Sequence, residues 1–497
     1  MNWEKWIAQK HVRCALWVSA MTLLFLAAGH GFGYLNLIYS GSGVMVDASR
    51  GRAAQIAAGR WAQPLYWMVR GGISAPLLVG LLSGVYLAAS AALVATVLHI
   101  EGRPALTLLA GALCLNPAVL AINAAELNVA DAKLLAFLLC LLGAALSVRG
   151  RWMLLPAAIC WGAGAALEPD MMSAGIALVV LTALRNLLAE QPAGTALRTI
   201  GRGLLALAAG TALYLLGWML FARRSGVAWS LSLCLPIGAQ EGGLPGVWLE
   251  PLRRYLHPIT AYRALGAMLG ALLLAGGFVL LALRAARLPR REGALALILA
   301  LLLPLAVNLP VPGTEAVRET GSTLAYAFLA VAAVTVFDAA YAHVRMVRAA
   351  FSAGMGILLL SAVIFSNQVY LKKNLEQQST LSLMTRVVNR MERTEGYVPG
   401  YTPVVFLGSM EKSPLSAPRF GFEAVEEFDA ASNRFAADGA EENTWYMWEI
   451  LGYPANMASY YETLAIAQSE EGQSMPAFPA EGSCRMLDGY MVVKLSD

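Results

Sequence analysis

Long apolar stretches alternate with short polar connections between positions 14 and 367. Each stretch is about 20 residues long, which is the length that a helix needs to cross the hydrocarbon core of a bilayer. The pattern predicts spans at residues 14–37, 74–98, 104–122, 132–148, 152–167, 172–189, 203–222, 263–283, 293–310, 321–340 and 349–367. We therefore expect a polytopic α-helical membrane protein with about eleven transmembrane helices.

The composition excludes a soluble globular protein. Apolar residues make up 58% of the chain and charged residues 14%, whereas about a quarter of a soluble domain is charged. The net charge of +4 is modest and indicates no nucleic-acid partner. Lys5, Lys10 and Arg13 precede the first apolar stretch, which lacks a small-residue cleavage site, so a retained helix is favoured over a removed signal peptide.

The charges of the connections predict the orientation. Connections rich in arginine at 149–151, 185–202, 284–291 and 345–348 belong on the cytoplasmic face, which places the N-terminus inside and, after an odd number of spans, the C-terminus outside. The predicted outer loops hold acidic residues, namely Asp47, Glu126, Asp131, Glu168, Asp170, Glu241, Glu250 and Glu315.

Two outer loops, 37–73 and 223–262, are too long to be simple turns, and loops of that length are usually functional or disordered. The first contains a candidate amphipathic helix at 48–61, which suits a segment lying along the membrane interface. We assign residues 1–367 to the transmembrane domain with these two loops.

Residues 368–497 are predicted to form a soluble domain outside the membrane. A polar helix is expected at 376–395, strands at 403–408 and 490–495, and a helix at 445–459. This mixture predicts a small α/β domain.

The candidate chemistry lies at the outer membrane surface. The chain has no Walker loop, no G-x-G-x-x-G, no H-E-x-x-H and no G-x-S-x-G motif, and five scattered histidines argue against a histidine metal site. Asp47, with Arg50 and Arg60 after it, could combine a general base with phosphate ligands. Alternatively, Asp47 caps a helix that begins at Ala48, which would contribute about 1 kcal/mol.

Several segments resemble a known family. The first outer loop carries Asp-x-x-Arg and then Gly-Arg, and the C-terminal region carries Pro-Val-Val-Phe-Leu-Gly and Met-Pro-Ala-Phe-Pro-Ala-Glu-Gly-Ser. With these motifs in this order, the chain resembles the serotype-converting O-antigen glucosyltransferases, a branch of the GT-C glycosyltransferases. The matching segments are 39–61, 367–368, 403–408, 475–483 and 492–495. The middle helices match only in hydropathy, and Val46-Asp47 stands where family members often carry two acids.

The resemblance implies a GT-C-like fold in a bacterial inner membrane, with the active site and the C-terminal domain facing the periplasm. The donor would be a polyprenyl-phosphate sugar, undecaprenyl-phosphate glucose by analogy, and the acceptor an extracytoplasmic glycan such as O-antigen. Asp47 would be the general base of an inverting displacement. Arg50, Arg60 and Arg318, in that order, are the candidates for binding the donor phosphate. No cofactor is expected, although a carboxylate cluster could hold Mg²⁺ weakly.

Four acidic residues and one tryptophan are secondary candidates for lining the cavity or binding the acceptor. They are Glu126, Asp131, Glu168, Asp170 and Trp61. The alternative for the acids is a solvated turn, and Glu168-Pro169 also suits a helix end.

Other polar residues have simpler interpretations. His30 is expected to be a packed or hydrogen-bonded helix residue, and Asn116 and Asn308 to join helices by hydrogen bonds. The stretch 253–255 is better explained as a solvated loop than as a donor site. Trp445 and Trp448 are expected in a core rather than against a sugar. A disulfide between Cys234 and Cys484 is a further hypothesis, because both would face the same oxidising compartment.

Two rival functions remain open on the sequence. A transporter or flippase would place ionisable groups near the bilayer midplane and often contains repeats or broken helices. An O-antigen polymerase or ligase would leave the folded C-terminal domain unexplained. The charges gather at the predicted outer ends of the helices, which favours the glycosyltransferase.

Overall fold

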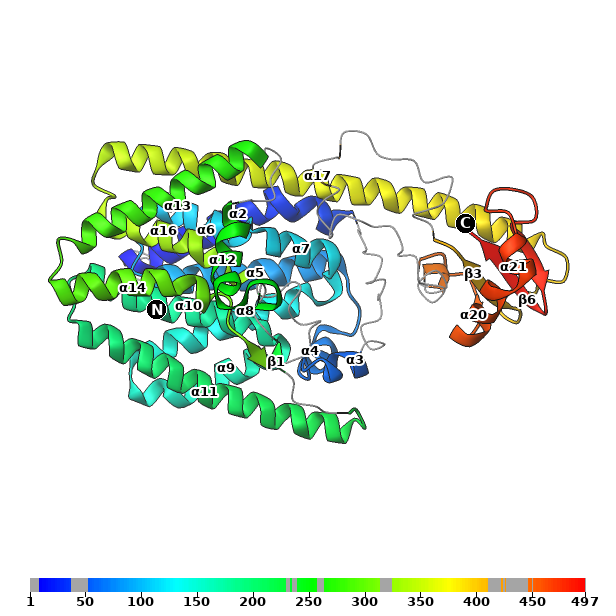
Figure 1. The fold of residues 1–497 in the computed structure, drawn as a ribbon, viewed down its shortest axis with the longest axis horizontal. Coiled ribbons are helices and arrows are strands. Elements are labelled where there is room, and N and C mark those ends of the chain that lie inside the picture. The colour runs from blue at the N-terminus through cyan, green and yellow to red at the C-terminus, as the bar shows by residue number, and fades with distance from the viewer. Residues whose placement is uncertain are drawn as a thin grey trace. The chain divides into compact units, whose positions relative to one another are not determined.

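The structure is a computed structural model that describes residues 9–36, 52–228, 233–234, 239–256, 263–312, 324–409, 422, 425, 446–448 and 450–496. The chain divides into two compact units (Figure 1). The first takes in most of the chain up to Asn367, and the second comprises 368–497 with the short pieces 33–46 and 124–128.

The first unit is a bundle of helices, and only one two-stranded antiparallel sheet, β1 (Leu233–Cys234) with β2 (Val311–Pro312), is found in its described part. Its helices are α2 (Lys10–Leu35), α3 (Arg52–Ala57), α4 (Gln63–Arg70), α5 (Pro76–Val97), α6 (Arg103–Cys114), α7 (Pro117–Ala125), α8 (Leu127–Arg149), α9 (Leu154–Leu167), α10 (Met172–Leu188), α11 (Ala193–Arg224), α12 (Ala239–Leu256), α13 (Arg263–Ala285), α14 (Arg290–Ala306), α16 (Ala327–Ala340) and α17 (Arg345–Glu392), the last of which continues into the second unit.

The protein is a polytopic helical membrane protein. Within the described ranges, eight helical segments are long and apolar enough to cross a membrane, with α6 and α7 counted together. The predicted spans at 152–167, 293–310 and 321–340 correspond to the shorter helices α9, α14 and α16. The total of eleven spans therefore stays a prediction.

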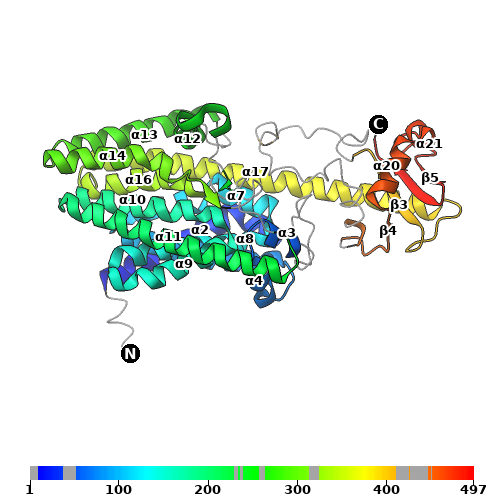
Figure 2. The ribbon, with the colours of Figure 1, turned by 60° about the horizontal axis from the view of Figure 1, so that its bottom comes forward.

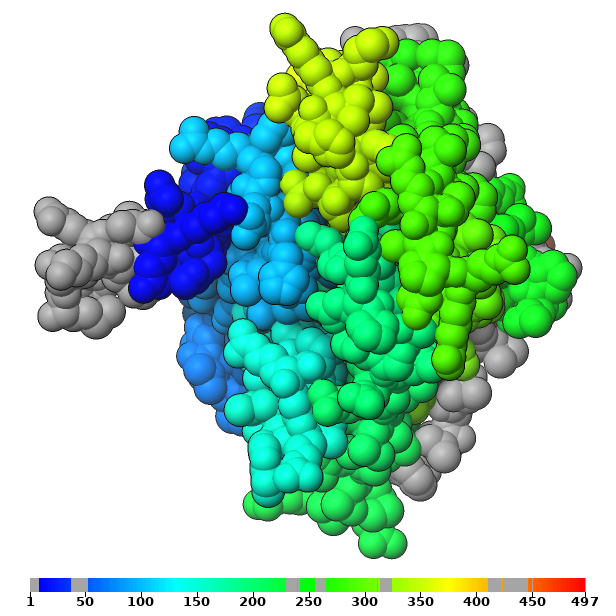
Figure 3. Space-filling view, turned by 90° about the vertical axis from the view of Figure 1, so that its left-hand side faces the viewer, coloured from blue at the N-terminus to red at the C-terminus, as the bar shows by residue number. Residues whose placement is uncertain are grey.

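The connections that carry the arginines lie at one end of the first unit. Figure 3 shows this end, where the start of α2 (dark blue) lies beside the connection from α5 to α6 (light blue). The helices α3 and α4 lie at the opposite end of the bundle, as Figures 1 and 2 both show. The lysine and arginine bias predicts that the first of these ends is cytoplasmic.

Close helix contacts in the first unit depend on glycine. The backbones of α9 and α11 approach so closely that a Cβ added to Gly210 would lie 2.4 Å from Cβ of Trp161 and 2.9 Å from the carbonyl oxygen of Ala158. Trp161 is fully buried. Small residues at such crossings are typical of membrane proteins, in which van der Waals packing drives helix association.

The third predicted span is broken. Helix α6 ends at Cys114, α7 begins at Pro117, and the side chain of Asn116 accepts a hydrogen bond from the backbone N–H of Ala118 at 2.8 Å. Asn116 therefore caps its own helix instead of joining two helices as expected. Nε2 of His30 lies 3.1 Å from the carbonyl oxygen of Cys114, and the ring is fully buried. This confirms the prediction that His30 is a hydrogen-bonded helix residue. It satisfies a carbonyl group at the break.

Helix α17 corrects another expectation. The sequence pattern separates a span at 349–367 from a polar helix at 376–395, yet one continuous helix of 48 residues covers both. The change from apolar to polar side chains near Asn367 marks a change of surroundings, because the backbone conformation does not change there.

The second unit is built on a mixed four-stranded sheet in the order β4 (Asn456–Met457), β3 (Pro403–Leu407), β6 (Tyr490–Lys494), β5 (Cys484–Leu487). Strand β3 is parallel to β4 and β6, and β5 is antiparallel to β6. Val404 and Val493 pack on one face against the end of α17, and Val405 and Val492 pack on the other against Ile466 of α20 (Tyr460–Gln468). Helix α21 (Glu470–Ser474) follows.

Strands were predicted at the positions of β3 and β6. The helix predicted at 445–459 is wrong, because the described residues of that stretch are helical only at 446–448 and then lead into β4.

Cys484 is a free, buried thiol. The side chain of Cys234 lies outside the described part of the chain, so the disulfide between the two residues stays a hypothesis. Burial raises the Cys484 pKa to about 11.

Exchanging Gly210 for alanine should destabilise the bundle, because α9 and α11 would have to separate. We expect a loss of about 1–3 kcal/mol, read as a lower midpoint of thermal unfolding in detergent. Gly201 lies in the same helix with no atom within 4 Å of an added Cβ, so Gly201→Ala is the matched control. Equal midpoints for the two variants would contradict the close packing.

The start of α20 should respond to pH through Glu462. Its pKa is lowered to about 2, first by the hydrogen bond with the Ser459 side chain and then by that with Tyr490, whose hydroxyl donates to Oε1 at 2.6 Å. The stabilisation is therefore present above the unfolded pKa of about 4.5 and is lost as the pH falls toward 2.

Hydrogen exchange at residues 460–468, corrected for the intrinsic rate at each pH, measures this loss. Exchange should accelerate below pH 4.5 in the wild type, and Glu462→Gln should abolish that acceleration. The same pH profile in both proteins would remove Glu462 as its cause.

Candidate functional site

The second half of the first long loop is folded onto the end of the bundle. Indole Nε1 of Trp218 in α11 donates to the carbonyl oxygen of Ile56 at 2.7 Å. The backbone N–H of Ala62 donates to Ala166 at 3.0 Å, and Nε2 of Gln63 donates to Leu167 at 2.9 Å. These bonds attach α3 and α4 to α9 and α11. The expected helix at 48–61 is seen only as α3, with 48–51 outside the described residues.

Trp61 is a packing residue between the loop and α11. Its ring stacks on Phe221 with a centroid distance of 4.7 Å, and its indole N–H donates to the carbonyl oxygen of Tyr214 at 3.3 Å. A Cβ at Gly217 would lie 2.4 Å from the Trp61 ring, so glycine makes room for it. These contacts fix the ring, and its predicted role toward an acceptor stays a prediction.

Glu168 lies between two cations. Nε of Arg60 is 3.1 Å from Oε2 of Glu168, and Nζ of Lys133 is 3.3 Å from the same oxygen. Glu168 and Lys133 are fully buried, and Arg60 is 8% exposed and also donates to Gln55. Charges removed from water in this way are stable only when they are paired. Arg60 thus anchors the loop, and its prediction as a phosphate ligand stays untested.

A second ion pair joins α4 to α8. Nη1 of Arg70 lies 2.6 Å from Oδ1 of Asp131, and the Tyr66 hydroxyl donates to Oδ2 at 2.9 Å. Burial raises the pKa of Tyr66, so it remains a neutral donor. The Trp67 ring packs on Val129 beneath this pair.

Asp131, Glu168 and Asp170 are all fully buried, so the alternative that they lie in solvated turns is wrong. Glu126 is half-buried and belongs to the second unit. Asp47, Arg50 and Arg318 lie outside the described residues.

Lys133 and Arg70, the partners of these acids, were not among the predicted site residues. A signal was present in each case, because each stands within or beside a predicted span, where an unpaired charge is costly. The sequence did not show which carboxylate each one contacts.

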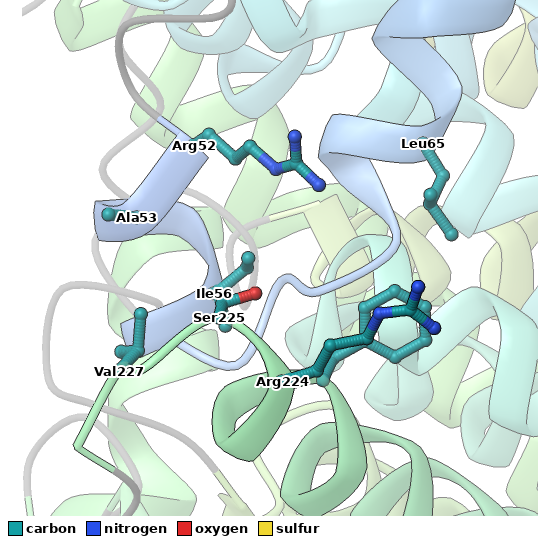
Figure 4. A pocket seen from close by; sticks show the side chains of 8 residues that line it. Arg52, Ala53, Ile56, Leu65, Arg224, Ser225 and Val227 are labelled. Carbon is teal, nitrogen blue, oxygen red and sulfur yellow. The ribbon is translucent and has the colours of Figure 1, made fainter.

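A cavity of about 710 Å³ opens beside α3 and the end of α11 (Figure 4). Its polar lining consists of Arg52, Arg224 and Ser225, and its apolar lining of Ala53, Ile56, Leu65, Phe221 and Val227. The side chains of Arg52 and Arg224 extend in the same direction, toward the side of Leu65 (Figure 4). Two guanidinium groups beside an apolar wall suit a ligand with an anionic head and an apolar tail.

The other predicted residues have structural roles. Nδ2 of Asn308 donates to the carbonyl oxygen of Val247 at 3.0 Å, which confirms that it joins two helices. Arg254 pairs with Glu250 at 2.7 Å on α12. Trp448 was expected in a core, but it is 37% exposed, and its indole N–H donates to the carbonyl oxygen of Ala455. Trp445 lies outside the described residues.

Comparisons with protein-family models, with curated proteins and with solved structures found no match for this chain. The resemblance to the O-antigen glucosyltransferases therefore rests on the sequence segments alone. Within the described ranges, no three histidine, cysteine or carboxylate side chains form a group that could hold a metal ion.

Glu168→Gln should strongly destabilise the first unit, because it leaves Arg60 and Lys133 buried without their carboxylate. We expect a loss of about 3–5 kcal/mol, measured by thermal unfolding in detergent. Lys133→Met added to Glu168→Gln should recover part of the loss, since it removes one of the two cations.

The matched control is Glu190→Gln, which breaks an ion pair with Arg284 in which the glutamate side chain is 67% exposed. That change should cost less than about 1 kcal/mol. A similar cost for Glu168→Gln and Glu190→Gln would show that the buried network contributes no more than a surface pair.

Proposed function

We propose that this protein transfers a sugar, glucose by the family resemblance, from a polyprenyl-phosphate donor to an extracytoplasmic glycan. The observation that carries the proposal is the cavity lined by Arg52 and Arg224 beside an apolar wall. Such a lining matches a phosphate joined to a prenyl chain. In this proposal the protein works in the bacterial inner membrane with the cavity facing the periplasm.

Arg52 and Arg224 take the main role in binding the donor phosphate, and Arg50, two positions before Arg52, joins them. The phosphate gains negative charge as the bond to the sugar breaks. Guanidinium groups already in place therefore stabilise the transition state more than the ground state. Arg60, which the sequence favoured for this role, acts instead as a positioning residue through its ion pair with Glu168. Arg318 stays a candidate.

Asp47 is the proposed general base. It stands five residues before Arg52, so an extended chain allows at most about 18 Å between their Cα atoms. A carboxylate within reach of the acceptor hydroxyl takes up its proton as the oxygen attacks the anomeric carbon. The anomeric C–O bond to the phosphate breaks at the same time, the phosphate leaves with the electron pair, and the configuration inverts.

The broken helix favours a second candidate, a transporter or flippase for a lipid-linked or small polar substrate. The interruption between α6 and α7, together with buried charges such as Lys133, resembles the discontinuous helices that form transport sites. Purified protein in proteoliposomes separates the two functions. Sugar transfer to an added glycan supports the enzyme, and movement of labelled polyprenyl-phosphate sugar across the bilayer without transfer supports the transporter.

The direct test of the enzyme uses radiolabelled polyprenyl-phosphate hexoses with membrane glycans as acceptors. The wild type should transfer label, and Asp47→Asn should reduce kcat about 100-fold or more while leaving insertion and thermal stability unchanged. Full turnover by this variant would remove Asp47 as the base, and no transfer by the wild type from any hexose donor would reject the function.

The cavity makes a separate prediction about the donor. Arg224→Ala should lower kcat/KM for the donor about tenfold, with most of the loss in kcat, because a charge-assisted bond that strengthens in the transition state is lost. Arg223 precedes it in the same helix turn, is exposed and does not line the cavity, so Arg223→Ala is the matched control. Equal kcat/KM values in the two variants would place the donor elsewhere.

A further inference from the structure

A second cavity lies at the opposite end of the first unit, between the start of α2 and the start of α6. Its volume is about 450 Å³. Its polar lining comprises Lys10, Arg13, Cys14, Glu101 and Arg103, and its apolar lining Leu16, Trp17, Ala20 and Leu106. Three cations and one carboxylate leave an excess of two positive charges, and no part of the proposed glycosyl transfer uses them.

The walls of this cavity are held in place by specific bonds. Indole Nε1 of Trp17 donates to the hydroxyl of Thr107 at 3.1 Å, and the guanidinium of Arg103 lies over the Trp17 ring at 5.1 Å from its centroid. Lys10 pairs with Glu101. The first helix and α6 are therefore joined across the cavity by their own side chains.

The connection that carries Glu101 and Arg103 is fixed from behind. Nε of Arg185 in α10 donates to the carbonyl oxygen of Leu98 at 3.1 Å. The Asp338 carboxylate in α16 accepts hydrogen bonds from the backbone N–H groups of Gly102 and Glu101. A side chain on Gly102 would collide with that carboxylate, since its Cβ would lie 2.9 Å from Oδ1. The basic rim is thus preorganised.

The outer side of the cavity is apolar. Leu16 is 50% exposed and Trp17 is 37% exposed, and both belong to a helix that is long and apolar enough to cross a membrane. In a bilayer these surfaces meet lipid chains. Basic groups at the end of an apolar groove match the phosphate and acyl chain of one lipid molecule.

We propose that this cavity binds an anionic phospholipid, with its phosphate between Arg13 and Arg103 and an acyl chain along Leu16 and Trp17. The site is independent of the proposed sugar transfer, because it lies at the other end of the unit. Its occupant would fasten the first helix to α6. A zwitterionic lipid has the same chains, but its own cation opposes the excess positive charge of the rim.

Cys14 provides a probe inside the cavity. It is half-buried and lines the site, and Cys160 in α9 is also half-buried but lies outside it. The full-length protein in nanodiscs is alkylated with an uncharged maleimide, and each cysteine is followed by peptide mass mapping. Phosphatidylglycerol should slow alkylation of Cys14 relative to phosphatidylcholine and leave the rate at Cys160 unchanged. Equal rates at Cys14 in both lipids would overturn the proposal.

The charge requirement is tested by native mass spectrometry of the full chain with added phosphatidylglycerol. Each basic side chain removed should weaken binding about fivefold, so Arg13→Ala with Arg103→Ala should lose most of it. The matched control is Arg287→Ala with Arg291→Ala, in which Arg287 lies in the connection between α13 and α14 and Arg291 in the first turn of α14. Equal losses in the two pairs would reduce the site to general surface attraction and overturn it.

Two further arms complete the test. Arg13→Lys with Arg103→Lys keeps the charges, so it should retain the preference for phosphatidylglycerol even if the alanine pair fails to fold. Inorganic phosphate should protect Cys14 far less than the lipid does. Equal protection would identify a free-anion site and overturn the assignment to a lipid.

Discussion

The arrangement of the proposed donor site depends on one buried carboxylate. Glu168 lies between Arg60, in the loop that carries α3 and α4, and Lys133 in α8. Removing these groups from water is costly, and only their mutual attraction and hydrogen bonds offset the cost. The loop is therefore held where Arg60 can reach Glu168. That position puts Arg52 next to the end of α11, so the ion pair, together with the hydrogen bonds of Trp218, Ala62 and Gln63, places one wall of the cavity.

Hydropathy predicted the helical membrane body well, because a bilayer demands about 20 apolar residues wherever a helix crosses it. Hydropathy did not predict where the helices continue and where they break. Helix α17 stays helical past Asn367 although its surroundings become polar, and the third span breaks at Asn116-Pro117 although its surroundings stay apolar. Hydropathy indicates whether a segment lies in lipid or in water, whereas proline, capping side chains and packing determine where a helix ends.

The site was only partly predictable. The sequence pointed to Arg60, Asp131 and Glu168, but it did not show that Arg60 pairs with Glu168 or that Asp131 pairs with Arg70, because pairing depends on which helices become adjacent. Arg52 and Arg224 gave no signal, since they are far apart in the sequence and arginines beside a span are ordinarily explained by lipid head groups. The second unit shows the same limit. Its β3 and β6 were predicted from continuous runs of apolar, β-branched residues, whereas α20 begins at a capping box formed by Ser459 and Glu462 that was not recognised.

The two cavities described above combine arginines with apolar walls, and they differ in the partners of those charges. At the end near α6, Lys10 is bonded to Glu101 and Arg103 lies over Trp17, so the rim is tied to the helices around it. A rim fixed in this way suits a lipid that remains bound. At the other end, Arg52 and Arg224 are exposed; Arg52 lies on the anchored loop, five residues after Asp47, and Arg224 ends α11. In the proposed sugar transfer, a site that releases a phosphate in each cycle would need binding groups that water can reach, and the ion pair of Arg60 with Glu168 holds the loop that carries Arg52.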